Sequence, residues 1–139
     1  MEQQSLHPDV LLHLLLNMGE AMLTVGGEVN RVEDTLSRMG RAYGAQQMNV
    51  FVITSSIIVT MAFSDGQELT QTRRIHSPGG TDFRKLEALN ALSRRCCAQP
   101  VSPEELEKEL AVIGRSAPRV SMVYLGSMLA GGSFAVFFG

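Results

Sequence analysis

The sequence is poor in aromatic residues and in net charge. It contains no tryptophan, and aromatic residues make up only 6% of the chain, so few flat side chains are present on which bases could stack. The formal net charge is -2, which gives no general electrostatic attraction to nucleic acid. We therefore expect no nucleic-acid partner. The hydrophobic content of 45% over 139 residues is sufficient for one domain with a core.

Cysteine and histidine are also scarce. The two cysteines, Cys96 and Cys97, are adjacent, and a disulfide between neighbours is strained, so we expect free thiols in a reducing compartment. The histidines His7, His13 and His76 lie on different predicted elements and share no ligand spacing. The sequence therefore predicts no metal site and no cofactor.

Charge is absent from the last twenty residues, 120–139. A helix of that length spans about 30 Å, the thickness of the hydrocarbon core of a bilayer. We interpret 118–139 as the start of a membrane domain, a truncated first transmembrane helix, and 1–117 as a cytoplasmic α+β domain. The basic residues Lys108, Arg115 and Arg119 favour a cytoplasmic position for that domain at the inner (plasma) membrane. The alternative is a buried C-terminal helix of a soluble protein.

Small residues recur within this apolar segment. Gly126 and Ala130 are four residues apart, as are Ser127 and Gly131, and such pairs let membrane helices approach closely. The expected partners are therefore the lipid bilayer and either the remaining membrane helices or a second membrane subunit of the same assembly.

Apolar periodicity predicts the fold of the preceding domain. Helices are expected at 8–24, 29–43, 83–96 and 103–113, and strands at 48–53, 57–63 and 68–75. The short apolar run 10–16 is interrupted by His13, so it is interpreted as part of a buried helix. The third helix is expected to bury Phe83, Leu86 and Leu89. The predicted fold class is α+β, a small antiparallel sheet of about three strands packed by helices, followed by the partial transmembrane helix.

Polar residues gather at the ends of these elements. The candidates are Arg31 and Glu33 on the second helix, Thr54 between two strands, Arg73, Arg74 and His76 after the hairpin, and Asp82 before the third helix. If the ends converge, they form a polar pocket of both charge signs, suited to a small zwitterion or dicarboxylate. The alternative is a solvated helix face, an exposed strand and a simple helix cap.

Two other functions are open at this point. A hydrolase-like soluble enzyme would use Ser55 or Ser56 with His76 and Asp82, although no nucleophile-elbow glycine pattern surrounds either serine. A purely structural oligomerisation domain, with the chain as a homo-oligomer, would need no site at all.

Three segments together resemble a known family. They are GGEVNRVEDTLSRMGRAYG at 26–44, TSSIIVTMAFSDGQELTQTRRI at 54–75 and GGTDFRKLEALNALSRR at 79–95. Their order is similar to that of the N-terminal domain of the threonine/serine exporter family. That pattern runs from a G-x-E-x-x-R-V-E-x-T helix through a Thr/Ser-rich strand pair and an Arg-bearing strand to a G-x-D-hydrophobic…N helix. One departure is Thr54-Ser55-Ser56, where the family often has Thr-Pro-Thr.

The resemblance implies a transporter component and not an enzyme. The family's polar signature falls on Arg31, Glu33, Thr35, Arg73, Asp82 and Asn90. With Thr54 and His76, these are the predicted substrate-binding or gating residues. The implied cargo is a small amino acid such as threonine or serine, or, in a two-component branch that this chain resembles, a dicarboxylate such as succinate. The N-terminal domain would gate the pathway or sense cargo.

Overall fold

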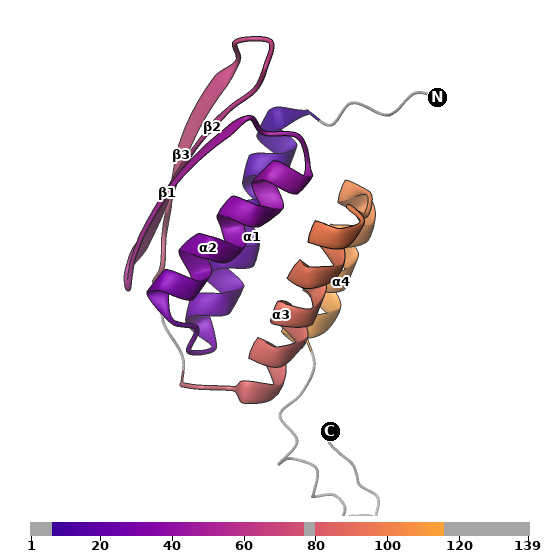
Figure 1. Ribbon diagram of the computed structural model, residues 1–139. Coiled ribbons are helices and arrows are strands. Elements are labelled where there is room, and N and C mark those ends of the chain that lie inside the picture. The colour runs from indigo at the N-terminus through magenta and orange to yellow at the C-terminus, as the bar shows by residue number, and fades with distance from the viewer. Residues whose placement is uncertain (1–6, 77–79, 116–139) are drawn as a thin grey trace, which may run out of the picture.

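The computed structural model describes residues 7–76 and 80–115, which form three layers (Figure 1). A three-stranded sheet is the first layer, α1 and α2 form the second, and α3 and α4 form the third. The elements are α1 (Pro8–Thr24), α2 (Val29–Ala42), β1 (Gln47–Ile53), β2 (Ser56–Ala62), β3 (Glu68–Arg74), α3 (Phe83–Ala98) and α4 (Pro103–Arg115).

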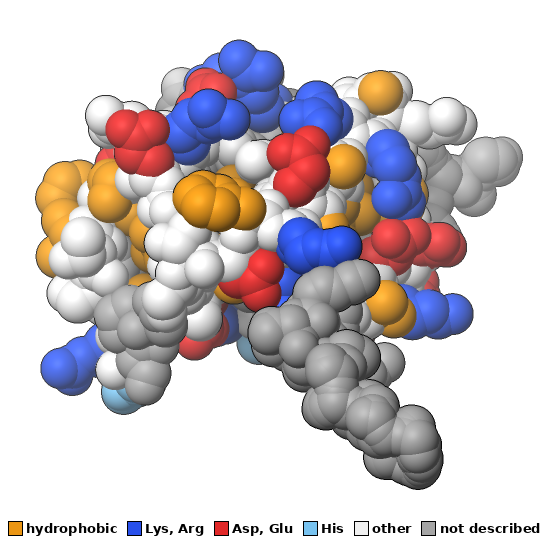
Figure 2. Space-filling model, turned by 90° about the horizontal axis from the view of Figure 1, so that it is seen from below, with side chains coloured by type: hydrophobic (Ala, Val, Ile, Leu, Met, Phe, Trp, Pro, Cys, Tyr) orange, Lys and Arg blue, Asp and Glu red, His pale blue; other side chains and the backbone are white. Residues whose placement is uncertain are grey.

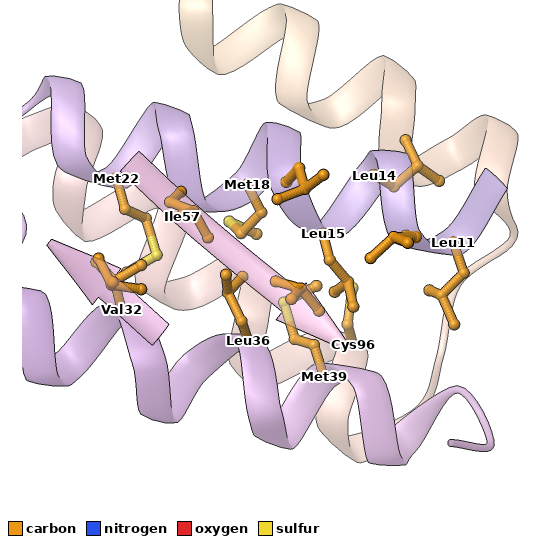
Figure 3. Packing of buried hydrophobic residues seen from close by; sticks show 14 of the residues in the cluster. Leu11, Leu14, Leu15, Met18, Met22, Val32, Leu36, Met39, Ile57 and Cys96 are labelled. Atoms are coloured by element: carbon orange, nitrogen blue, oxygen red, sulfur yellow. The ribbon is translucent and has the colours of Figure 1, made fainter. Parts of the chain in front are cut away.

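Helix α1 lies in the middle layer and is apolar around most of its circumference. Its buried side chains are Leu11, Leu12, Leu14, Leu15, Leu16, Met18, Met22 and Leu23. It contacts β2 and β3 on one side and α3 and α4 on the other. In Figure 3, Val32, Leu36 and Met39 of α2 point toward the α1 side chains. A helix that is covered on several sides is apolar around most of its surface. The prediction that the apolar run near the start of α1 belongs to a buried helix is therefore confirmed.

The sheet has the order β1-β2-β3, and both neighbouring pairs are antiparallel. In the register, Val52 pairs with Ile57 and Ile57 with Arg73, so these three side chains lie on the face that α1 and α2 cover. Figure 1 shows all the helices on that one side of the sheet. No helix among residues 7–76 and 80–115 covers the opposite face, and Phe51 on it is 55% exposed. The sheet therefore forms an outer wall of the domain.

Gly19 allows α1 to lie close to both α2 and β2. A Cβ atom at this position would stand 2.8 Å from Ile57 Cδ1 and 2.9 Å from Leu36 Cδ1. Both distances are shorter than the 3.5–4.0 Å at which carbon atoms pack well, so a larger residue would require the ends of these two side chains to shift.

Side-chain caps fix the ends of α3 and α4. The Asp82 carboxylate accepts a hydrogen bond from the Lys85 N–H at 3.2 Å, and the Ser102 hydroxyl accepts one from the Glu105 N–H at 3.2 Å. The phenol of Tyr43, just after α2, donates to the carbonyl oxygen of Val101 at 2.7 Å. This bond ties the end of the middle layer to the connection between α3 and α4.

The α+β class and the three-stranded antiparallel sheet are confirmed, while one core prediction is wrong. Phe83 is 76% exposed, although Leu89 on the same helix is buried. Periodicity identifies the inward face of a helix, but it does not reveal how far the neighbouring layer extends along that helix. Phe83 is the first residue of α3, and the buried residues of this helix begin only at Leu89.

The predicted transmembrane helix at 118–139 lies outside the described residues. The division into 1–117 and 118–139 therefore stays a prediction. Among residues 7–76 and 80–115, no helix combines the length and the apolar character needed to cross a membrane.

Candidate functional site

A groove of about 690 Å³ runs between α2 and α3, and we call it the α2–α3 groove. It is lined by Arg31, Asp34, Thr35 and Arg38 from α2 and by Asn90, Ser93, Arg94, Cys97 and Ala98 from α3. Three of the eight predicted site residues meet here, namely Arg31, Thr35 and Asn90. Most of the residues that line the groove are polar, and they carry both charge signs.

Helical geometry explains why these side chains share one groove. On α2 the lining residues recur at i, i+3, i+4 and i+7 from Arg31, and on α3 they recur with the same spacing from Asn90. Residues at this spacing lie on one face of a helix. The core faces are occupied by Val32, Leu36 and Met39 on α2 and by Leu89, Leu92 and Cys96 on α3. The two polar faces therefore flank the contact between the helices.

The arginines of the groove differ in their partners. Arg38 pairs with Asp34 at 3.1 Å, and Arg94 lies 3.8 Å from Glu87. All four side chains are well exposed, so these pairs contribute little to stability. Arg31 has no hydrogen bond or ion pair with any part of the chain that the structure describes. Its side chain is exposed, so solvent can reach the guanidinium.

Both cysteines are free thiols, as the sequence predicts. Cys96 is buried in the core, whereas Cys97 is exposed and lines the groove. Partial burial, and secondarily the neighbouring Cys96, raises the pKa of the Cys97 thiol. At neutral pH this thiol is therefore mostly protonated and adds no charge to the groove.

Glu33 faces away from the groove, toward the sheet. Its Oε2 accepts a hydrogen bond from the backbone N–H of Val52 at 2.9 Å. This amide points away from β2, so the carboxylate satisfies a donor on the outer edge of β1. The structure thus gives Glu33 a contact that joins α2 to the sheet.

Arg73 lies against α1 on the covered face of β3. Its Nη1 donates to Glu20 Oε1 at 2.7 Å and to Asn17 Oδ1 at 2.9 Å, and its Nη2 is 3.5 Å from His13 Nδ1. Asn17 and Glu20 occupy the narrow polar stripe of α1. Arg73 therefore joins the sheet to the middle layer and does not line the α2–α3 groove.

Thr54, His76 and Asp82 lie toward the end of the domain where α2 and α3 begin. Thr54 is in the tight turn between β1 and β2, and His76 is exposed after β3. The backbone N–H of Asp82 donates to Val25 O at 3.0 Å, which places the start of α3 beside the α1–α2 connection. Figure 2 views this end, where basic and acidic side chains are interspersed. The polar ends lie toward the same end of the domain, but Thr54, His76 and Asp82 are not among the residues that line the α2–α3 groove with Arg31.

The structure adds six groove residues that the sequence does not assign to the site: Asp34, Arg38, Ser93, Arg94, Cys97 and Ala98. In the sequence, their only signal is the i, i+3, i+4, i+7 spacing on the polar faces of two helices. Polar helix faces are usually solvated, and only the packing of α2 on α3 brings these two together.

A comparison with protein families tests the resemblance to threonine/serine exporters that the motifs indicate. The sequence profile of the ThrE family of threonine/serine exporters matches residues 13–139. The chain belongs to this family. Neither a curated protein nor a solved structure matches the chain. The threonine/serine exporter family is a transporter family, and its match spans both helices of the α2–α3 groove and all eight predicted site residues.

Proposed function

We propose that this threonine/serine exporter chain is the N-terminal, cytoplasmic part of an inner-membrane exporter of small polar metabolites, and that its α2–α3 groove binds cargo and gates the pathway. The observation that carries the proposal is Arg31, a guanidinium without an intramolecular partner among the described residues, in a groove of about 690 Å³. Guanidinium groups bind carboxylates through paired, charge-assisted hydrogen bonds.

The other lining groups fit the chemistry of threonine and serine. Both amino acids carry a carboxylate, an ammonium group and a hydroxyl. Arg31 and Arg94 provide donors for the carboxylate, and Asp34 provides an acceptor for the ammonium. Thr35, which is half-buried, provides a hydroxyl that can bond the cargo hydroxyl.

A dicarboxylate such as succinate would use the same groove differently. It carries two carboxylates and no ammonium group, so it would engage two of the three arginines and leave Asp34 paired with Arg38. Asp34 is therefore the residue that distinguishes the two kinds of cargo. Its replacement should weaken binding of an amino acid and leave binding of a dicarboxylate unchanged or stronger.

The direct test is calorimetric titration of the full chain in detergent with threonine, serine and succinate. Arg31→Ala should weaken binding of the true cargo about ten- to a hundredfold, the usual effect of losing a charge-assisted hydrogen bond. Arg84→Ala, an exposed arginine on α3 outside the groove, is the matched control and should have no effect. Equal binding by the two variants would remove Arg31 from the site.

The transport role is tested in cells that carry the complete exporter. Arg31→Ala should lower efflux of the bound metabolite while the amount of exporter in the membrane stays constant. Unchanged efflux would show that the groove has no part in transport.

The cytoplasmic position is tested with the exposed thiol of Cys97. A maleimide that cannot cross membranes should label Cys97 only after the cells are permeabilised, and a Cys97→Ser variant identifies the labelled site. Labelling in intact cells would place the domain on the other side of the membrane.

A further inference from the structure

The outer edges of the two edge strands, β1 and β3, differ in their hydrogen bonding. On β1 the outward N–H of Val52 is bonded to the Glu33 carboxylate, and α2 packs along this strand. At the end of β3 the N–H of Ile75 donates to the carbonyl oxygen of Ser55, just before β2, so the backbone groups of Ile75 point toward β2. The direction of these groups alternates along an antiparallel strand, and Arg74, which pairs with Ser56, therefore points outward. By the same alternation Glu68, Thr70, Thr72 and Arg74 all turn their backbone N–H and C=O groups away from β2.

The outer edge of β3 has no partner within residues 7–76 and 80–115. None of these four residues makes a backbone hydrogen bond on the outer side, and all four are exposed. Native proteins usually shorten, cover or bulge an edge of this kind because it can pair with another strand. Here seven consecutive residues are regularly paired on one side and open on the other.

The side chains along this edge are complementary to themselves. If two copies of β3 run antiparallel about a two-fold axis at Gln71, Glu68 of each copy faces Arg74 of the other. In the same register Thr70 faces Thr72. Opposite charges and threonine pairs directly across two strands are both favourable, and a two-fold axis produces each pair twice. A shift by two residues in either direction would place neither Glu68 nor Arg74 opposite a charged β3 residue.

The backbone supports the same register. Both members of each pair, Glu68 with Arg74 and Thr70 with Thr72, are residues whose hydrogen-bonding groups point outward. Each pair can therefore exchange both of its backbone hydrogen bonds. We infer that β3 is the interface through which two copies of this chain join their sheets into one continuous six-stranded sheet. This inference is independent of any ligand in the α2–α3 groove.

Charge reversal tests the register with the full chain in detergent, by sedimentation across a dilution series. Glu68→Arg and Arg74→Glu should each weaken the dimer at least about tenfold, because each change creates two contacts between like charges. The double variant Glu68→Arg/Arg74→Glu restores opposite charges and should dimerise like the original chain. A monomeric original chain, or a dimer that tolerates both single reversals, would overturn the inference.

A cross-linking experiment keeps the test decisive if a reversal variant fails to fold. In a Cys97→Ser background, Gln71→Cys would place two thiols opposite each other at the axis, in a pair with Cα atoms about 4.5 Å apart. That spacing is within the range of disulfides, so mild oxidation should give a covalent dimer. Asn49→Cys on β1 is the matched control and should stay monomeric. Equal cross-linking of the two variants would contradict the β3 interface.

Discussion

The guanidinium of Arg73 on β3 lies 2.7 Å from the carboxylate of Glu20 on α1. Their side chains are 22% and 38% exposed, so the pair is partly shielded from water. In the register Arg73 stands beside Ile57, at a position on the covered face that Val52 fills on β1. A charged residue can occupy this apolar row because α1 offers it a carboxylate and an amide at the same place.

Replacing Arg73 with alanine should destabilise the domain. The change leaves Glu20 and Asn17 with unsatisfied, partly buried acceptors, and we expect a loss of about 1–3 kcal/mol in the free energy of unfolding. Urea unfolding of the chain in detergent measures it. Arg84→Ala, an exposed arginine on α3, is the control and should change stability by less than about 0.5 kcal/mol. If the two variants unfold alike, Arg73 does not hold the sheet to α1.

Two variants of Glu33 should differ in stability because its carboxylate accepts a hydrogen bond from the Val52 N–H. Glu33→Gln keeps an oxygen that can accept this bond, whereas Glu33→Ala removes the acceptor and leaves a backbone donor unpaired. We expect the alanine variant to lose about 1–2 kcal/mol of stability and the glutamine variant clearly less. Asp34→Ala, whose side chain is exposed, provides the control. Equal losses for the two Glu33 variants would mean that charge, and not this hydrogen bond, explains the role of Glu33.

Arg73 and Glu33 also show how far the sequence determines the candidate site. Residue types and their order identified both as important, and the helices and strands carrying them were predicted within a few residues. Their partners, Glu20 and Val52, are 53 and 19 positions away in the chain, and no local pattern reveals such contacts. Whether a charged side chain faces a ligand, another helix or a strand edge depends on layer packing, which periodicity does not specify.

The α2–α3 groove shows the same limit, because its polar residues come together only through packing. Apolar periodicity predicts the core residue Leu89 on α3, because burial imposes a spacing of three and four. The polar groups outside the core positions of α2 and α3 look like two ordinary solvated surfaces. Only the contact between α2 and α3 gathers Arg31, Thr35 and Asn90 into one groove.

Tyr43 should make stability depend on alkaline pH. Burial raises the pKa of its phenol above the usual value near 10, so the unfolded chain loses this proton first as the pH rises. The stabilisation from the neutral phenol is fully present below about pH 10 and is lost as the pH climbs toward the folded-state value. Unfolding curves taken from neutral to alkaline pH should therefore show falling stability.

The Tyr43→Phe variant separates the hydrogen bond from the titration. At neutral pH it should lose about 1 kcal/mol, because the Val101 carbonyl no longer receives the phenol O–H. Above pH 10 its stability should fall less steeply than that of the original chain, since the titrating group is gone. Parallel pH profiles for the two proteins would mean that Tyr43 does not carry the alkaline dependence.

Cys97 provides a chemical measure of the groove, with Cys96 as the internal control. A maleimide reacts with thiolates, so the buried Cys96 should stay unlabelled in the folded chain while Cys97 reacts. Because partial burial raises the pKa of Cys97, its labelling should be slow at neutral pH and accelerate as the pH rises toward that pKa.

Cargo in the groove would cover the Cys97 thiol, and at a ligand concentration ten times its Kd the labelling rate should fall about tenfold. Mass spectrometry of the labelled chain distinguishes the two cysteines. Equal labelling of both, or no protection by a metabolite that calorimetry shows to bind, would place the ligand outside the α2–α3 groove.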